Sequence, residues 1–263
     1  MKLAKAVACL AISLASFGAF SQGFEGGIPA GWTCKGYCST SGSNGDVTLA
    51  PTGASAYGFV STAGSSETGV SPFGLGGETT GSVLRSSTFS ADAGDPLKFF
   101  FNYITSDGAG FADYAFARLL NASDLSQAAL LFTARTTPSG SIVPGFGMPA
   151  PEATLNPTDV LIIGGAPTWS ALGSDSGRCF DLGCGYTGWI ESNYNIGLTG
   201  DFILEFGVVN WSDSNFASGM AFDGITVNGN PIAVPEPSVY VMMIAGLLVI
   251  GSARRRKGVA GPV

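Results

Sequence analysis

Short runs in which apolar and polar residues alternate recur along the middle of the chain. In 97–103 every second residue is Leu, Phe, Phe and Tyr, and in 202–209 every second residue is Phe, Leu, Phe and Val. Alternation with a period of two places one set of side chains on one face of a β-strand. The pattern therefore predicts strands with one buried face.

The same pattern predicts ten strands, joined by turns that the 39 glycines and 14 prolines favour. They are 47–49, 57–62, 82–89, 97–103, 114–120, 128–135, 160–163, 187–192, 202–209 and 221–227. No long amphipathic helix and no internal repeat is present. We expect an all-β fold, an antiparallel β-sandwich of the jelly-roll-like type, formed by one domain over 22–233.

The N-terminal 21 residues have the pattern of a secretory signal peptide. Lys2 and Lys5 precede an apolar stretch over 6–20, and small residues follow at the exit, around Ser21. The alternative is a buried N-terminal helix. Export is favoured because the charged start, the short apolar core and the small-residue exit occur together.

An apolar run near the C-terminus predicts one transmembrane helix over 239–253. Fifteen residues rise about 22 Å as a helix, and the basic residues that follow can extend this reach by snorkelling. The basic cluster consists of Arg254, Arg255, Arg256 and Lys257. Positive charge stays on the cytoplasmic side, so the body of the chain is expected outside the inner membrane.

The four residues before this helix are Val234, Pro235, Glu236 and Pro237. The Pro-Glu-Pro motif, the helix and the basic cluster together resemble the PEP-CTERM sorting signal of Gram-negative bacteria, here over 234–257. The resemblance implies recognition by an exosortase, transient residence in the inner membrane, and sorting to the surface or matrix of biofilm-forming, exopolysaccharide-producing cells. A permanent single-pass anchor is the alternative.

Charge changes the picture once the two ends are removed. The whole chain has a net charge of −7, but 22–237 keeps 6 of the 12 cations and all 19 acids, which gives −13. Such a body will not bind nucleic acid through counterion release. It is suited to calcium, neutral glycans or cationic partners, or the acids serve solubility alone.

The body contains no histidine and has four cysteines. The first fact excludes Ser-His-Asp and Cys-His catalysis. In an exported chain, Cys34, Cys38, Cys179 and Cys184 predict two disulfide bonds. The short spacings favour the local pairs Cys34–Cys38 and Cys179–Cys184. Cross-links between the two segments and a zinc site of four cysteines are the alternatives.

Three aspartates form a candidate calcium site. Asp107 and Asp113 lie in a glycine-containing loop between two predicted strands, and Asp223 lies on the last strand among apolar neighbours. A carboxylate there requires a partner. Either all three aspartates bind a structural calcium ion, or Arg118 pairs with Asp223 across strands. No other cofactor is predicted.

Aromatic and acidic residues supply two further hypotheses. The four tryptophans offer flat faces for stacking on sugars, and Trp169, Trp189 and Trp211 lie near predicted loops or strand ends, although core packing is the alternative for each. Glu191 and Glu205 are a carboxylate pair of the kind that glycosidases use, but no motif selects them.

We therefore expect an exported surface or matrix protein, without catalytic activity, that associates with exopolysaccharide. The first alternative is a secreted glycan-acting enzyme with a carboxylate pair. The second is a structural adhesion module that binds proteins.

Overall fold

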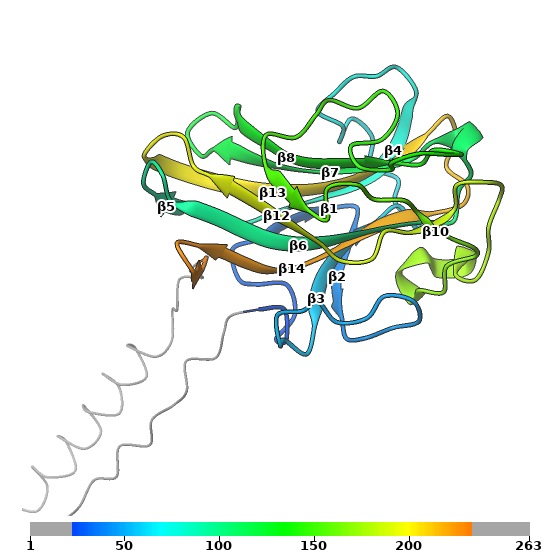
Figure 1. Cartoon of the computed structure of the whole chain (residues 1–263), viewed down its shortest axis with the longest axis horizontal. Helices are drawn as coiled ribbons and strands as arrows, with labels where there is room; N and C mark the ends of the chain where they lie inside the picture. Colours follow the sequence, from blue (N-terminus) through cyan, green and yellow to red (C-terminus); the bar gives the residue numbers. More distant parts are fainter. Residues whose placement is uncertain (1–22, 233–263) are drawn as a thin grey trace, which may run out of the picture.

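Two antiparallel β-sheets lie face to face in the computed structural model, which describes residues 23–232 (Figure 1). Sheet A has six strands: β1 (Thr33–Lys35), β4 (Glu78–Arg85), β13 (Gly200–Trp211), β7 (Tyr114–Asn121) and β8 (Gln127–Arg135) in that order, with β5 (Phe89–Ala91) paired to β13. The predicted all-β antiparallel sandwich is confirmed.

Sheet B has nine strands. Its main order is β10 (Ile163–Gly164), β11 (Gly185–Tyr186), β6 (Pro96–Thr105), β14 (Ser218–Val227), β3 (Tyr57–Ser61) and β2 (Tyr37–Ser41). To these are added β12 (Ile190–Asn195), β9 (Thr154–Asn156) and β15 (Asn230–Pro231), and two short 3-10 helices, η1 (Ala109–Phe111) and η2 (Ser170–Asp175), lie in the loops. The chain passes between the sheets seven times, at β1/β2, β3/β4, β5/β6, β6/β7, β8/β9, β12/β13 and β13/β14.

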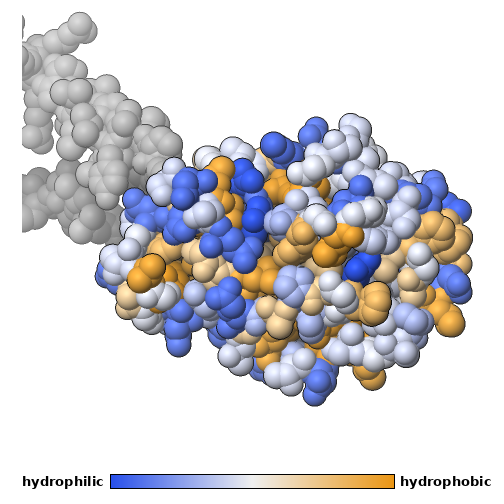
Figure 2. Space-filling view, turned by 90° about the horizontal axis from the view of Figure 1, so that it is seen from above, coloured by the Kyte–Doolittle hydropathy of each residue, from blue (hydrophilic) through white to orange (hydrophobic). Residues whose placement is uncertain are grey.

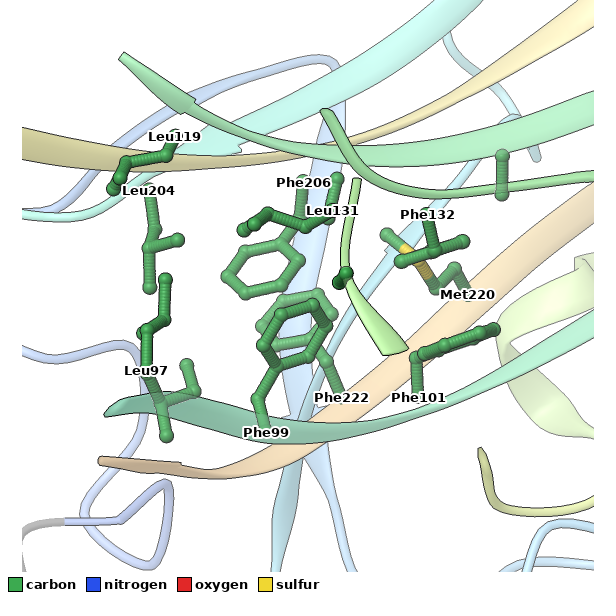
Figure 3. Close-up of a cluster of buried hydrophobic side chains, with 14 of the residues drawn as sticks. Leu97, Phe99, Phe101, Leu119, Leu131, Phe132, Leu204, Phe206, Met220 and Phe222 are labelled. Carbon is green, nitrogen blue, oxygen red and sulfur yellow. The ribbon is translucent and has the colours of Figure 1, made fainter. Parts of the chain in front are cut away.

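Phenylalanine rings fill the space between the sheets (Figure 3). Phe101 of sheet B stacks on Phe132 of sheet A with ring centroids 3.6 Å apart, and Phe206 of sheet A stacks on Phe222 of sheet B at 4.1 Å. All four side chains are fully buried. The alternating positions that predicted these strands are thus the positions that face the core.

Six of the predicted strands are found with ends shifted by a few residues. They are 57–62, 97–103, 114–120, 128–135, 202–209 and 221–227, which correspond to β3, β6, β7, β8, β13 and β14.

The prediction for 82–89 is wrong because two strands, β4 and β5, meet there. Ser86 lies between them, and its hydroxyl accepts a hydrogen bond from the Leu204 amide at 2.9 Å. A side chain therefore takes the place of a backbone partner at this break.

Three other predicted strands differ from the structure. Val47 forms only an isolated bridge with Asn44, so 47–49 is not a strand. The strand near 160–163 is β10, which starts at Ile163, and the strand near 187–192 is β12, which starts at Ile190. Glycine and short polar turns limit each of these segments.

Strands β1, β2, β9, β11 and β15 were not predicted. They are short, and β1 and β2 are exposed or half-buried along their whole length, so no apolar alternation marks them. Pairing with a longer neighbour defines them instead.

The signal peptide over 1–21, the motif and basic cluster over 234–257 and the transmembrane helix over 239–253 lie outside the described residues. Within 23–232 no helix has the length and apolar character that a membrane crossing requires.

Removal of a stacked ring should test the core. We expect Phe206→Ala to lower the free energy of unfolding by about 3–5 kcal/mol, because it deletes buried surface and leaves a cavity between the sheets. Leu198→Ala, at a side-chain position that is 76% exposed, should change it by less than about 0.5 kcal/mol. Urea denaturation measures both variants, and equal effects would contradict this description of the core.

Candidate functional site

A pocket of about 440 Å³ lies at the edge of sheet B, where the described chain both begins and ends. Its floor is formed by β6 and β14, and its walls by the segments 23–32 and 51–54. Gly23 and Ile232 both contribute to its lining. Pockets of this volume are typical of sites for small ligands.

Aromatic side chains form one wall of this pocket. Phe24 contacts Trp32 edge-to-face with centroids 5.6 Å apart, and Phe24 also packs against Phe222 of the core at 5.4 Å. The core therefore fixes the position of Phe24, which in turn orients Trp32. The indole Nε1 of Trp32 is buried and has no hydrogen-bond partner among the described residues.

Asp223 supplies the pocket with a carboxylate. A β-bulge follows Asp223 in β14, and Gly224 there adopts a left-handed conformation with φ of 66°. A bulge reorients side chains relative to a regular strand. Asp223 accepts a hydrogen bond from the Thr52 hydroxyl at 2.6 Å, and burial raises the pKa of its carboxyl.

Lys98 and Phe100 of β6 complete the floor. Phe100 lies opposite Asp223 in the strand pairing, and the Lys98 ammonium lies 5.3 Å from the centroid of the Phe100 ring. Lys98 also forms an ion pair with Glu191. The pocket thus combines flat apolar surfaces with one carboxylate, one ammonium group and the hydroxyl groups of two threonines, Thr52 and Thr226.

The predicted pair of Arg118 with Asp223 is wrong. Arg118 donates to Glu205 on the outer face of sheet A, whereas Asp223 is on the outer face of sheet B. The whole thickness of the sandwich separates the two side chains.

The structure does not bring the three aspartates of the predicted calcium site together. Asp113 accepts a hydrogen bond from the Ser218 hydroxyl, and Asp223 follows Ser218 by five positions along β14, roughly 16 Å. Within the described part of the chain, no group of three or more Asp, Glu, Cys or His side chains is arranged to hold a metal ion. The set is therefore wrong as a single site, and calcium binding stays a prediction.

Asp113 instead connects the two sheets. Its carboxylate accepts hydrogen bonds from the Trp211 amide of sheet A at 2.8 Å and from the Ser218 hydroxyl of sheet B at 2.6 Å. Complete burial, together with the nearby charge of Asp107, raises the pKa of Asp113 well above its ordinary value. The residue has a structural role at the end of the sandwich away from the pocket.

Asp107 is also buried, with 2% of its surface exposed. One carboxylate oxygen accepts a hydrogen bond from the Gly108 amide at 2.7 Å, and the other has no partner among the described residues. Burial raises its pKa to about 7, with added repulsion from Asp213 and Asp175.

Both predicted local disulfide bonds are present, so the cross-linked and zinc alternatives are wrong. Cys34–Cys38 joins β1 of sheet A to β2 of sheet B, with Cα atoms 6.1 Å apart. Cys179–Cys184 closes the loop before β11, with Cα atoms 5.7 Å apart.

The prediction of Trp169 as a glycan-binding residue is wrong, because it lies in the protein interior. It is 1% exposed, and its Nε1 donates to the Tyr57 hydroxyl at 3.0 Å. Trp189 is half-buried and donates to the Thr48 carbonyl, and the Arg135 guanidinium lies 4.2 Å from the ring centroid of Trp211. Glycan binding by Trp189 and Trp211 stays a prediction, and neither lines the pocket.

Trp32 is the tryptophan that lines the pocket. The sequence pattern did not select it, because the selection favoured tryptophans near predicted loops or the ends of predicted strands. The available signal was its place in a glycine-rich loop directly before Cys34, since disulfide-anchored loops commonly carry binding residues. Phe24, Thr52 and Lys98 had no such signal.

Glu191 and Glu205 do not form a catalytic pair. They lie on the outer faces of different sheets, and each forms ion pairs with basic side chains on its own face. The hydrogen bond from Lys98 lowers the pKa of Glu191, while Glu205 binds two arginines. A glycosidase needs its two carboxyl groups within about 10 Å of each other across one substrate bond.

Comparison with known proteins identifies the C-terminal segment. A family model described as the PEP-CTERM protein-sorting motif matches residues 233–257, which confirms the resemblance seen in the sequence. The chain therefore carries this motif, which implies export, processing by an exosortase and sorting to the cell surface. No match among curated proteins reaches significance.

Solved structures show only distant likeness. The K1 and K3 cleaved adhesin domains of Lys-gingipain from Porphyromonas gingivalis W83 are 13% and 11% identical, with TM-scores of 0.34 and 0.35. These alignments cover 80% and 78% of this chain and 96% and 95% of those chains. The enzymatically active domain of tailspike protein 4 of bacteriophage CBA120 is 10% identical over 75% of this chain and 20% of that chain, with a TM-score of 0.33. At such scores the likeness carries no argument about function.

The raised pKa of Asp107 predicts how stability depends on pH. The folded state holds the proton more tightly than the unfolded chain, whose carboxyl titrates near 3.8, so the stabilisation is complete below that pH and is lost as the pH rises to about 7. Asp113 acts in the same direction. We expect the free energy of unfolding to fall between pH 5 and pH 8.

Asp107→Asn should flatten this dependence, whereas Asp159→Asn, the same change at an exposed loop position, should leave it unchanged. Urea denaturation at several pH values measures the slope. A variant at Asp107 that retains the full slope would refute the assignment.

Proposed function

We propose that the sandwich is a non-catalytic glycan-binding module of an exported surface protein, which associates with extracellular polysaccharide. Export and surface sorting follow from the motif at residues 233–257. On this proposal, a signal peptidase removes the N-terminal segment and the inner membrane holds the precursor until an exosortase acts. The observation that carries the binding function is the pocket lined by Trp32, Phe24 and Asp223.

The aromatic wall supports a sugar as the ligand. A pyranose ring presents a face of C–H groups that packs on a flat indole or phenyl surface, while its hydroxyl groups require hydrogen bonds. Trp32 is half-buried and held edge-on by Phe24, so its orientation is fixed before a ligand arrives. Preorganisation of this kind lowers the entropy cost of binding.

Polar groups in the pocket match the needs of sugar hydroxyls. The Trp32 Nε1 is buried and has no partner among residues 23–232, so Trp32 offers a ligand its ring face rather than this N–H group. Asp223 is a strong acceptor in the lining, positioned by Thr52, and Lys98 is a donor there. A ligand hydroxyl both accepts and donates, so it pairs with either kind of group.

The pocket does not support glycan hydrolysis. Asp223 is the single carboxylate among its lining residues, and hydrolysis by the common mechanisms requires two. Asp107 and Asp113, the close acidic pair, are 2% and 0% exposed, so a substrate does not reach them in this conformation.

A second candidate function is protein adhesion through the opposite end. Antiparallel pairing of β10 with β11 brings the segment after Gly164 beside the disulfide loop 179–184, where the Gly165 amide donates to the Cys184 carbonyl at 3.3 Å. Exposed apolar side chains of this loop are Phe180 (47%), which packs against Phe111 and Phe216, and Leu182 (72%). Clustered apolar exposure is typical of interaction surfaces.

Calcium binding is a separate proposal. In it, the carboxylate oxygen of Asp107 that has no hydrogen-bond partner among the described residues is one ligand of the ion. Thermal unfolding with and without EDTA tests it. A decrease in Tm on chelation is expected, and an unchanged Tm removes calcium from the account.

Substitution of Trp32 tests the glycan pocket directly. We expect Trp32→Ala to weaken binding to the polysaccharide of the source organism at least about tenfold, since loss of a stacking platform costs about 1.4 kcal/mol or more. Trp32→Phe should show an intermediate loss, because it keeps an aromatic face of smaller area. Affinity electrophoresis in polysaccharide-containing gels measures the change.

Phe146→Ala is the control, at an exposed aromatic side chain outside the pocket, and should bind as the unaltered protein does. Near-ultraviolet circular dichroism confirms that each variant is folded. Absence of binding by the unaltered protein, or equal binding by Trp32→Ala, would overturn the proposed function.

A further inference from the structure

Two arginines lie side by side on the outer face of sheet A. The strand pairing places Thr33, Arg85, Glu205 and Arg118 in one row across β1, β4, β13 and β7. Adjacent strands are about 4.8 Å apart, so the two arginine backbones are separated by roughly 10 Å, with Glu205 between them. Figure 2 shows the molecule from the side of sheet A, where strongly hydrophilic side chains lie among apolar ones.

Glu205 fixes the orientation of both guanidinium groups. Arg85 donates through Nε to one carboxylate oxygen at 2.6 Å, and Arg118 donates through Nε to the other at 2.5 Å. The Glu205 side chain is 1% exposed, whereas those of Arg85 and Arg118 are 32% and 16% exposed. The clamp is therefore buried, and the arginines reach the surface above it.

The outer nitrogens of both arginines remain available. Each guanidinium has five N–H donors, and only Nε is used in hydrogen bonds with residues 23–232. The Nη groups of two adjacent arginines match the two oxygens of a carboxylate.

Charge at this row is unlike the rest of the body. Two arginines and one glutamate leave one positive charge, and the exposed Lys35 lies on the neighbouring strand β1. Elsewhere, Lys98 and Arg178 are paired with Glu191 and Asp175, and Arg135 is buried, 5% exposed, beside the Trp211 ring. The row is thus a local cationic site in a body with a formal charge of −13 over 22–237.

We propose that Arg85 and Arg118, clamped by Glu205, bind the carboxylate of a uronic acid residue in an acidic polysaccharide. This inference rests on the proposed function, because its ligand is again a glycan, but it uses a different face of the sandwich. The negative body opposes general attraction of a polyanion, so recognition depends on one carboxylate at one place rather than on a long charged groove.

Polygalacturonate and its methyl-esterified form provide matched probes. Both present the same sugar backbone, and esterification removes the carboxylate charge. We expect the full-length protein to bind polygalacturonate at least about tenfold more tightly than the ester, as measured by affinity electrophoresis in a non-ionic detergent.

Variants assign the binding to the arginine pair. Arg85→Gln and Arg118→Gln should each weaken binding of polygalacturonate about tenfold or more, and Arg85→Lys should show a smaller loss because it keeps the charge but not the planar fork. Arg178→Gln, an exposed arginine beside η2, changes the net charge by the same amount and should change binding less than about twofold. Thermal unfolding checks that each variant is folded. Substitution of Arg85 is expected to disturb the fold less than substitution of Arg118, because the Arg85 side chain is more exposed.

Three outcomes overturn the inference: equal binding of the ester, an equal loss in Arg178→Gln, or equal binding of poly-L-glutamate, which would show an acidic peptide site instead. The test is separate from that of the pocket. If Trp32→Ala abolishes binding of a neutral glycan while Arg85→Gln leaves polygalacturonate binding intact, the proposed function stands and this inference fails.

Discussion

Stacked phenylalanine rings between the two sheets are the contact on which the rest of the structure depends. Phe101 with Phe132, and Phe206 with Phe222, each join one sheet to the other. Because these rings occupy the inner faces, polar side chains with accessible groups are confined to the outer faces and the ends of the sandwich. The location of every candidate site follows from this constraint.

Of the two glycan sites that we propose, one lies at the edge of sheet B and the other on the outer face of sheet A. The pocket with Trp32 and Asp223 is built on sheet B, and the arginine pair is built on sheet A. Both use an inner layer of fixed contacts to orient an outer group: Phe24 packs on the core and orients Trp32, while buried Glu205 orients the arginines. A single rigid sandwich can thus contact a polysaccharide from two sides, as expected for a matrix protein.

The sequence predicted the fold better than the sites. Alternation in β6, β13 and β14 directly reports which side chains face the core, so the sandwich could be inferred from local pattern. Short exposed strands such as β1 depend on pairing with distant partners, and no local pattern marks them. The disulfide pairs were predictable because a separation of four or five residues favours local closure.

Site residues depend on which segments the topology brings together. Arg118 and Asp223 both carry charge on regular strands, but the sequence does not tell which sheet each strand joins, so their predicted pairing was wrong. Trp169 was chosen for its place in a loop, yet that loop folds back over sheet B and buries it against Phe59. Trp32 was left out because Lys98, Phe100 and Asp223, which form the floor of its pocket, are distant in sequence.

The indole N–H signals in a proton–nitrogen correlation NMR spectrum test the central claim most directly. The chain has four tryptophans, so each contributes one resolved probe. On titration with the bound polysaccharide fragment, the account predicts that the Trp32 signal shifts, while the Trp169 signal, held by Tyr57 in the core, stays in place. A bound glycan that leaves the Trp32 signal unmoved would contradict it.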